Sequence, residues 1–177
     1  MSTVLAIEEV YEGYEINSQI ERSSQIEMRE VEGYIGLFAK EDIIEGSVMF
    51  YLKGEVSIHP NKYSIQLDLN KHLDFPAVRK ANDDLDYCWQ YLNHSCEPNG
   101  YMNIEEFTFR ALRSVRKGEE ITFNYLTTEF ELATPFNCQC GSARCFGFIQ
   151  GNKYLTTIQM AELLLLVASA CPEIRRK

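Results

Sequence analysis

The chain has 177 residues, 45% of them hydrophobic and 24% charged, so it is long enough to bury the core of one compact soluble domain. Its formal net charge of −9 disfavours direct nucleic-acid binding, which requires a basic footprint, and favours basic partners. The longest apolar run, residues 163–168, is too short for a membrane span, which takes about 20 residues.

The first 32 residues are acidic and carry no clear periodicity, so we treat residues 1–32 as an N-terminal segment. They lack the basic region and the long apolar stretch of a secretory signal. We therefore expect an intracellular protein, in the nucleus or the cytoplasm. In such a reducing compartment, clustered cysteines indicate metal binding rather than disulfides.

Short strands are predicted along the next part of the chain. Residues 33–58 begin with a glycine-marked turn and continue into strands, with β-formers concentrated at 47–52. Residues 62–69 alternate between polar and apolar, which predicts a strand that carries Tyr63 on the same face as Ile65 and Leu67.

Residues 70–88 are polar and mixed, which predicts an insert that is partly helical. Residues 107–112 and 121–125 again have strand character, with a turn at 117–118 between them. No Gly-x-Gly-x-x-Gly run opens a helix after a strand, so a Rossmann-type cofactor site is not supported. Many short strands and few helices predict a mainly β fold.

The last predicted element is a helix. Residues 156–159, Thr-Thr-Ile-Gln, fit a capping box, and the helix should continue to about Ala170, before Pro172. It is apolar almost all the way round, so it is buried on more than one side or it docks on a partner. A homodimer through this helix is one such arrangement.

Three cysteines at 138, 140 and 145 follow a C-x-C-x4-C spacing that indicates a metal loop. Structural zinc needs four ligands, and the spacing alone does not choose the fourth among Cys88, Cys96, Cys171 or a histidine. Free thiols are the alternative, and we rank it below the metal because exposed clustered thiols oxidise readily.

Two further runs complete a recognisable set of motifs. Residues 91–99 read Tyr-Leu-Asn-His-Ser-Cys-Glu-Pro-Asn, and residues 118–125 read Gly-Glu-Glu-Ile-Thr-Phe-Asn-Tyr. With the cysteine segment 138–148 they closely resemble, in order and spacing, the motifs of SET-domain protein-lysine methyltransferases that carry a post-SET zinc segment. The resemblance covers roughly residues 32–151.

The resemblance implies a mainly β SET-domain fold of small sheets whose two central motifs meet in a knot-like crossing, then a post-SET zinc loop and a C-terminal helix. The implied division of the chain is an N-terminal segment at 1–32, a SET domain at 33–130 with an insert at about 70–88, a post-SET segment at 131–151 and a helical segment at 152–177.

The resemblance also implies the functional residues. Its zinc ligands are Cys96, Cys138, Cys140 and Cys145. Its contacts with S-adenosylmethionine come from Gly33, Gly36, Leu37, Asn93, His94, Tyr125 and Phe148. The glycine run of residues 33–39 resembles the family's Gly-x-Gly motif, with Gly36 as the second glycine and Tyr34 where the first usually stands.

Tyr125 is the catalytic tyrosine that the resemblance implies. Phe123 occupies the position where Phe or Tyr influences how many methyl groups are added. Because Phe offers no hydroxyl to hold a water, we predict room for di- or trimethylation; the alternative is that Phe123 is a core residue. Tyr63 is a further candidate for the substrate channel, although most such tyrosines are half-buried packing residues.

The leading hypothesis is therefore an S-adenosylmethionine-dependent lysine methyltransferase that acts on a basic protein, such as a histone, without direct nucleic-acid or membrane binding. The alternatives are a non-catalytic SET-like scaffold with structural zinc and a stand-alone zinc module with unrelated chemistry. The presence of Asn93, His94 and Tyr125 favours the enzyme over a scaffold, and a stand-alone zinc module leaves the other two motifs as coincidence.

Overall fold

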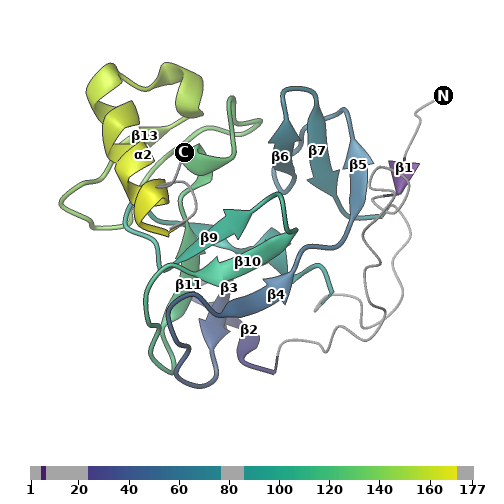
Figure 1. The fold of residues 1–177 in the computed structure, drawn as a ribbon, viewed down its shortest axis with the longest axis vertical. Helices are drawn as coiled ribbons and strands as arrows, with labels where there is room; N and C mark the ends of the chain where they lie inside the picture. The colour runs from purple at the N-terminus through teal and green to yellow at the C-terminus, as the bar shows by residue number, and fades with distance from the viewer. Residues whose placement is uncertain (1–4, 7–23, 77–85, 171–177) are drawn as a thin grey trace.

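The computed structural model describes residues 5–6, 24–76 and 86–170 (Figure 1). Its strands are β1 Leu5–Ala6, β2 Ile26–Val31, β3 Tyr34–Ala39, β4 Val48–Tyr51, β5 Glu55–Ser57, β6 Ile65–Asp68, β7 Lys71–Asp74, β8 Asn93–His94, β9 Gly100–Asn103, β10 Thr108–Ala111, β11 Glu120–Phe123, β12 Phe136–Asn137 and β13 Phe148–Ile149. Three short 3-10 helices (η2 Cys88–Tyr91, η3 Tyr125–Thr127 and η4 Asn152–Tyr154) and the helix α2 Thr157–Ala170 complete the described elements.

The strands pair into small sheets, as the mainly β prediction requires. One sheet has the order β1-β5-β7-β6, a second β4-β10-β9 and a third β2-β3-β11-β8, while β12 and β13 form a hairpin. Figure 1 shows the first sheet on one side of the molecule and α2 with β13 on the other, with the two remaining sheets between them. The predicted fold class is therefore confirmed.

The two central motifs meet in the third sheet. Strand β8 pairs in parallel with β11, so that Asn93 lies opposite Thr122 and His94 opposite Phe123. The buried Asn99 side chain joins them further, because its Nδ2 donates to the Glu120 carbonyl (2.7 Å) and its Oδ1 accepts from the Thr122 N–H (2.9 Å). Satisfying a buried amide in this way fixes the register of the two motifs.

The main core fills the space between the sheets. Phe109, Leu37, Leu73 and Ile121 are fully buried, and Trp89 is 2% exposed while its Nε1 donates to the Lys53 carbonyl (2.9 Å). A second, smaller core contains Cys96, Leu126, Ile149 and Leu163, the last of which belongs to α2. This second core joins the cysteine segment and the helix to the rest of the domain.

The strand predicted at 62–69 is shorter than expected. It begins only at Ile65, because the Asn61 side chain holds a turn by accepting hydrogen bonds from the N–H groups of Tyr63 (2.8 Å) and Ser64 (3.1 Å). Such an Asx turn competes with strand pairing. Tyr63 therefore lies before the strand, in a turn, and is 43% exposed.

The predicted partly helical insert at 70–88 is also corrected in part. Its first residues form β7, which pairs with β6 as a hairpin, and its end enters the 3-10 turn η2. Residues 77–85 lie outside the described part of the chain. At 121–125 the strand stops at Phe123, so Tyr125 stands in η3 and not on β11.

Helix α2 begins where the capping box predicts. The Thr156 N–H and Oγ1 both bond Gln159 Oε1 at 3.0 Å, and the Gln159 N–H donates back to Thr156 Oγ1 (3.3 Å). Leu163 is buried, whereas Ile158, Leu164 and Leu165 are exposed. The helix therefore packs on the domain by one side, and the homodimer stays a prediction. None of the described helices has the length and hydropathy of a membrane span.

Candidate active site and cysteine cluster

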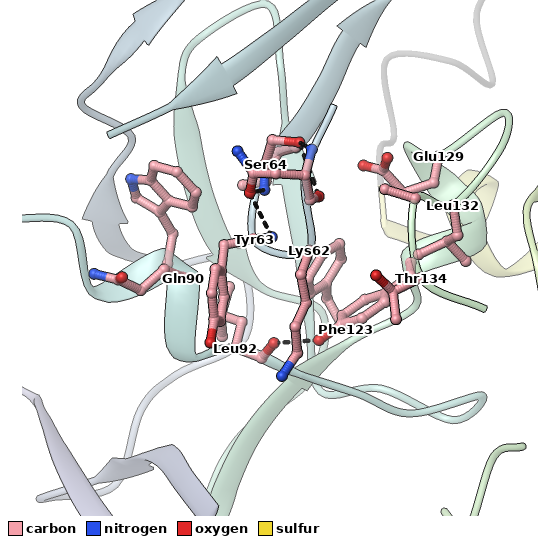
Figure 2. Close-up of a pocket in the computed structure, with 14 residues that line it drawn as sticks. Lys62, Tyr63, Ser64, Gln90, Leu92, Phe123, Glu129, Leu132 and Thr134 are labelled. Atoms are coloured by element: carbon pink, nitrogen blue, oxygen red, sulfur yellow. Dashed lines mark hydrogen bonds between the residues drawn. The ribbon is translucent and has the colours of Figure 1, made fainter. Parts of the chain in front are cut away.

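A pocket opens between the turn before β6 and the segment after η3 (Figure 2). Its wall includes all three predicted catalytic residues, Tyr63, Phe123 and Tyr125. The rings of Phe123 and Tyr125 lie 4.8 Å apart between centroids, although Tyr125 has left the strand. Phe123 is 5% exposed and also packs on Phe109, so it belongs to the core and to the pocket wall at once.

Tyr125 is held by its hydroxyl, which donates to the Leu92 carbonyl (2.6 Å). Burial, with the nearby carboxylates of Glu129 and Glu120, raises the pKa of Tyr125 well above its ordinary value. The phenol therefore stays protonated at neutral pH, and its proton is committed to Leu92. What it offers a bound group is an oxygen lone pair, which accepts a hydrogen bond.

His94 joins the Tyr125 backbone to the cysteine cluster. Its Nδ1 accepts from the Tyr125 N–H (3.1 Å), and its Nε2 lies 3.3 Å from Cys96 Sγ. Burial lowers the pKa of His94 to about 4, so the ring is neutral at physiological pH. With Nδ1 as acceptor, the ring proton is assigned to Nε2, where it donates to the sulfur.

Gly36 on β3, Asn93 on β8 and Glu120 on β11 meet in the third sheet, β2-β3-β11-β8. The Asn93 Nδ2 donates to Glu120 Oε1 (2.8 Å), and the Tyr34 hydroxyl donates to Glu120 Oε2 (3.3 Å). A Cβ at Gly36 would lie 2.8 Å from Glu120 Oε1 and 3.1 Å from Asn93 Nδ2. The absence of a side chain at Gly36 is therefore what lets these two polar groups approach β3.

Replacing Gly36 with alanine is expected to lower the free energy of unfolding by about 1–3 kcal/mol, because the new methyl overpacks this contact. Urea unfolding measures the change. Ile44→Ala is the control, since it removes a side chain that is 74% exposed and lies outside this contact, so it should cost less. Unchanged stability in the Gly36 variant would show that Glu120 and Asn93 move aside freely.

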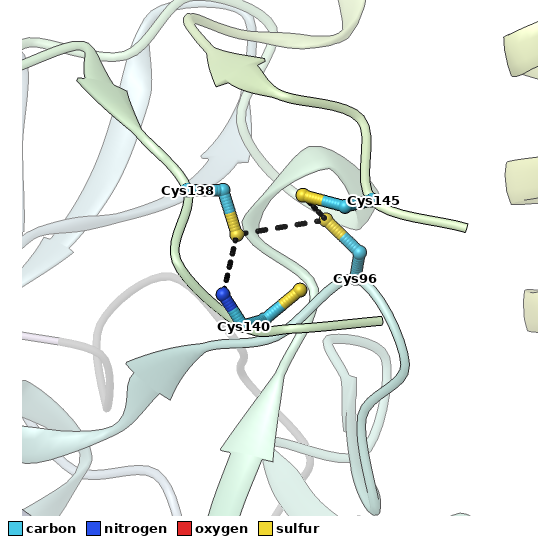
Figure 3. Close-up of side chains that lie close together, drawn as sticks. All are labelled: Cys96, Cys138, Cys140 and Cys145. Carbon is cyan, nitrogen blue, oxygen red and sulfur yellow. Dashed lines mark hydrogen bonds between the residues drawn. The ribbon is translucent and has the colours of Figure 1, made fainter. Parts of the chain in front are cut away.

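The four predicted zinc ligands come together, although they are far apart in the sequence (Figure 3). The Sγ atoms of Cys96, Cys138, Cys140 and Cys145 all lie within 4.8 Å of one another. Cys96 Sγ is 3.8 Å from Cys138 Sγ and 3.9 Å from Cys145 Sγ. The structure thus singles out Cys96 from the fourth-ligand candidates among the described residues.

The geometry and polarity of the cluster fit zinc. A tetrahedral ion with Zn–S bonds of about 2.3 Å separates its sulfurs by roughly 3.8 Å. Backbone N–H groups point at three of the sulfurs: Cys140 N–H at Cys138 Sγ (3.4 Å), Phe146 N–H at Cys96 Sγ (3.3 Å) and Gly147 N–H at Cys145 Sγ (3.4 Å). Such donors stabilise thiolates, which is the form that binds metal.

The other predicted cofactor residues, Gly33, Leu37 and Phe148, lie on separate parts of the structure. Gly33 forms the turn between β2 and β3 with a φ of +87°, a conformation that favours glycine. Leu37 is fully buried in the core, so a cofactor contact there would come from its backbone. Phe148 lies on the β12–β13 hairpin and is 51% exposed.

Sequence reasoning missed Glu129 and Gln66, which are buried beside the pocket. The Gln66 N–H donates to Glu129 Oε1 (2.8 Å), and the Phe130 N–H donates to Gln66 Oε1 (2.7 Å). This reciprocal pair ties β6 to the segment after η3. No local pattern marks either residue, because their contact spans 63 residues of sequence.

Comparison with known proteins gives a family for this arrangement. The family model of the SET domain matches residues 34–126. The chain is 42% identical over 72 residues to "Methyltransferase flvH" of Aspergillus flavus, which covers 40% of this chain and 38% of that protein. It is 31% identical over 137 residues to "Histone-lysine N-methyltransferase, H3 lysine-36 specific" of Candida albicans, covering 70% of this chain and 16% of that protein.

Solved structures agree on the fold. A crystal structure of "KRYPTONITE in complex with mCHG DNA and SAH" superposes with a TM-score of 0.50 at 20% identity, covering 68% of this chain and 27% of that one. At this identity the likeness concerns the fold. The chain spans well under half the length of each of these relatives.

Proposed function

Since the chain belongs to the SET-domain family, we propose that it transfers methyl groups from S-adenosylmethionine to lysine side chains of a basic protein. The observation that carries the proposal is the placement of Tyr125. Its ring lines the pocket, while its backbone N–H is held by His94 of the other central motif. One residue thus stands between a side-chain pocket and the predicted cofactor residues.

The proposed cofactor contacts are Asn93 and Gly36, which meet at Glu120, and His94, which contacts Tyr125, with Gly33 at the preceding turn. The presence of SAH in the solved structure supports S-adenosylmethionine as the cofactor. S-adenosylmethionine, when bound, would supply a methyl group on a sulfonium. A neutral amine would bond to the methyl carbon as its bond to sulfur breaks, which leaves S-adenosylhomocysteine. The Asn93 side chain, held by Glu120, would orient the cofactor.

The chain's own residues act on the incoming lysine. Tyr63, Phe123, Trp89 and Leu92 line part of the pocket with apolar surface, which excludes water from the incoming side chain. The Tyr125 oxygen, with its proton held by Leu92, accepts an N–H of the amine and so aims the nitrogen lone pair. Alignment of this kind supplies much of the rate in a displacement.

Zinc has a structural role in this proposal. Cys96, Cys138, Cys140 and Cys145 would hold the ion, which ties the post-SET segment to the end of β8. No step of the transfer uses it. The ion would instead fix Cys96, whose sulfur accepts a hydrogen bond from His94 Nε2.

A histone is the proposed substrate. The named activities of the Candida albicans relative and of the Arabidopsis thaliana "Histone-lysine N-methyltransferase ASHH2", which is 30% identical over 138 residues, support it. The net charge of −9 agrees with a basic partner. A histone substrate would place the protein in the nucleus, and we propose this location.

Incubation of the purified protein with methyl-labelled S-adenosylmethionine and core histones tests the proposal. We expect label on histone lysines. Cofactor binding by calorimetry without transfer to any basic protein would instead support the non-catalytic scaffold. Absence of cofactor binding by zinc-loaded protein would overturn the methyltransferase proposal.

The product is proposed to be di- or trimethyl-lysine, because Phe123 presents no hydroxyl to the pocket. Phe123→Tyr adds a hydroxyl that can hold a water in the space of the second methyl group, so the variant should yield mainly monomethyl-lysine. Mass spectrometry of the product over time measures the distribution. Only monomethyl-lysine from the wild type after long incubation would show that the inference from Phe123 is wrong.

A further inference from the structure

Glu129 is a buried carboxylate in the wall of the pocket. It is 7% exposed and lies two residues after the end of η3. Its Oε1 accepts two hydrogen bonds, from the Gln66 N–H (2.8 Å) and from Thr128 Oγ1 (3.1 Å). Its second oxygen, Oε2, accepts no hydrogen bond from the described residues. It is not among their buried polar atoms that lack a partner, so it is open to the pocket and available to a donor or a cation.

The carboxylate is held in place from both sides. Gln66, itself 8% exposed, accepts from the Phe130 N–H (2.7 Å), and its Nε2 donates to the Asp68 carbonyl (3.2 Å). Glu129 therefore cannot turn away from the pocket without breaking the link between β6 and the segment after η3. A binding group fixed in advance loses little conformational entropy when a ligand arrives.

No described cation neutralises Glu129. The titratable groups that share its pocket wall are Tyr125, Tyr63 and Lys62, and none of them forms a hydrogen bond with it. Figure 2 shows the Lys62 amino group directed away from Glu129.

The other charged groups on the elements around it are engaged elsewhere. Glu131 pairs with Lys153 at the surface, and Asp68, on β6, accepts from the Leu69 N–H (2.8 Å). The pocket thus contains an uncompensated negative charge beside the tyrosine proposed to be catalytic.

Building on the proposed methyl transfer, we propose that Glu129 is the residue that selects a lysine side chain: its Oε2 accepts a hydrogen bond from the lysine ammonium as it enters the pocket. A short charge-assisted bond of this kind is stronger than one between neutral groups. Norleucine, which has the four side-chain carbons of lysine but no amino group, would enter the pocket and offer no hydrogen bond to Oε2.

This role makes substrate binding depend on pH near neutrality. Burial raises the pKa of Glu129 to about 7, so the carboxyl is mostly neutral at pH 6 and mostly ionised at pH 8. Because the ammonium binds the ionised form, the affinity for lysine should rise about tenfold from pH 6 to pH 8, in proportion to the ionised fraction. His94 and Tyr125 do not titrate in this window, since the pKa of His94 is lowered to about 4 and that of Tyr125 is raised.

The test uses two capped pentapeptides, one with a central lysine and one with norleucine at that place. Their binding to the full chain with zinc and S-adenosylhomocysteine is followed at pH 6, 7 and 8 by NMR of the peptides, whose signals shift and broaden on weak binding to any variant. The ¹³C signal of the Glu129 carboxyl reports its titration in the wild type. Glu129→Gln keeps the size and one acceptor oxygen, so it can retain the bond from Gln66. Glu41→Gln removes an exposed carboxylate that lines no part of the pocket and controls for net charge.

We expect wild type and Glu41→Gln to bind the lysine peptide about tenfold more tightly at pH 8 than at pH 6, and Glu129→Gln to bind it weakly and without this slope. The Glu129 carboxyl signal of the wild type should titrate near 7 and shift to lower pH with the lysine peptide. Equal binding of the two peptides, or an unchanged slope in Glu129→Gln, would overturn the proposal.

The labelled-histone assay distinguishes failure of the proposed Glu129 role from failure of the proposed methyl transfer. Lysine selection that depends on Glu129 without methyl transfer would support the binding role and contradict the proposed enzyme. Methyl transfer whose Michaelis constant has the same pH dependence in wild type and Glu129→Gln would support the enzyme and overturn the role of Glu129.

Discussion

Replacing Tyr125 with phenylalanine is expected to lower the turnover of methyl transfer by at least about a hundredfold, the cost of misplacing a reacting group. The variant loses the only side-chain atom of Tyr125 that can accept an N–H of the amine. The ring remains, because it packs on Phe123 and His94 at centroid distances of 4.8 Å and 5.1 Å. Initial rates with labelled cofactor at saturating histone measure the loss.

The effect on turnover is separable from an effect on stability. Losing the hydroxyl bond to Leu92 should cost about 1 kcal/mol of folding free energy, which leaves the protein folded and its cofactor binding intact. Tyr154→Phe is the matched control, because it removes a tyrosine hydroxyl that bonds Glu131 at the surface (2.7 Å). A Tyr125 variant with wild-type turnover would show that the amine is aligned by the pocket walls alone.

The sequence predicted best what is local or carried by a motif. The capping box at 156–159 placed the start of α2, and β-formers placed β4, β10 and β11 within a residue or two. These features depend on neighbours in the chain, so a single sequence contains them. The meeting of Asn93 with β11 is a long-range feature, and only the family resemblance implied it.

The sequence predictions failed where the structure depends on a competing side chain or on a contact between residues far apart in the chain. The alternation at 62–69 predicted a strand through Tyr63, but the Asn61 side chain competes for the backbone N–H groups of Tyr63 and Ser64. Glu129 was not identified from the sequence, because its partner Gln66 lies on β6, 63 residues earlier in the chain.

Replacing Cys138 with serine is expected to remove zinc from the protein and unfold the post-SET segment. The second core is small: among the described residues, its buried members are Cys96, Leu126, Ile149 and Leu163. Structural zinc contributes on the order of 10 kcal/mol in small modules, which is comparable to the stability of a whole domain. Zinc content, measured by atomic emission, should fall from about one ion per chain to a small fraction, and resistance of residues 131–151 to proteolysis should be lost.

Loss of this segment should also abolish methyl transfer, although no cysteine enters the pocket. Phe136 of β12 packs edge-on against both His94 and Tyr125, at centroid distances of 5.6 Å and 6.0 Å, and Cys96 Sγ accepts from His94. Without zinc both supports are released, and Tyr125 loses the His94 ring that fixes its backbone. Cys88→Ala, a buried thiol outside the cluster, should keep its zinc and its activity. Wild-type protein purified without chelator that contains far less than one zinc ion per chain would contradict this account, because the four sulfurs would then pack as thiols.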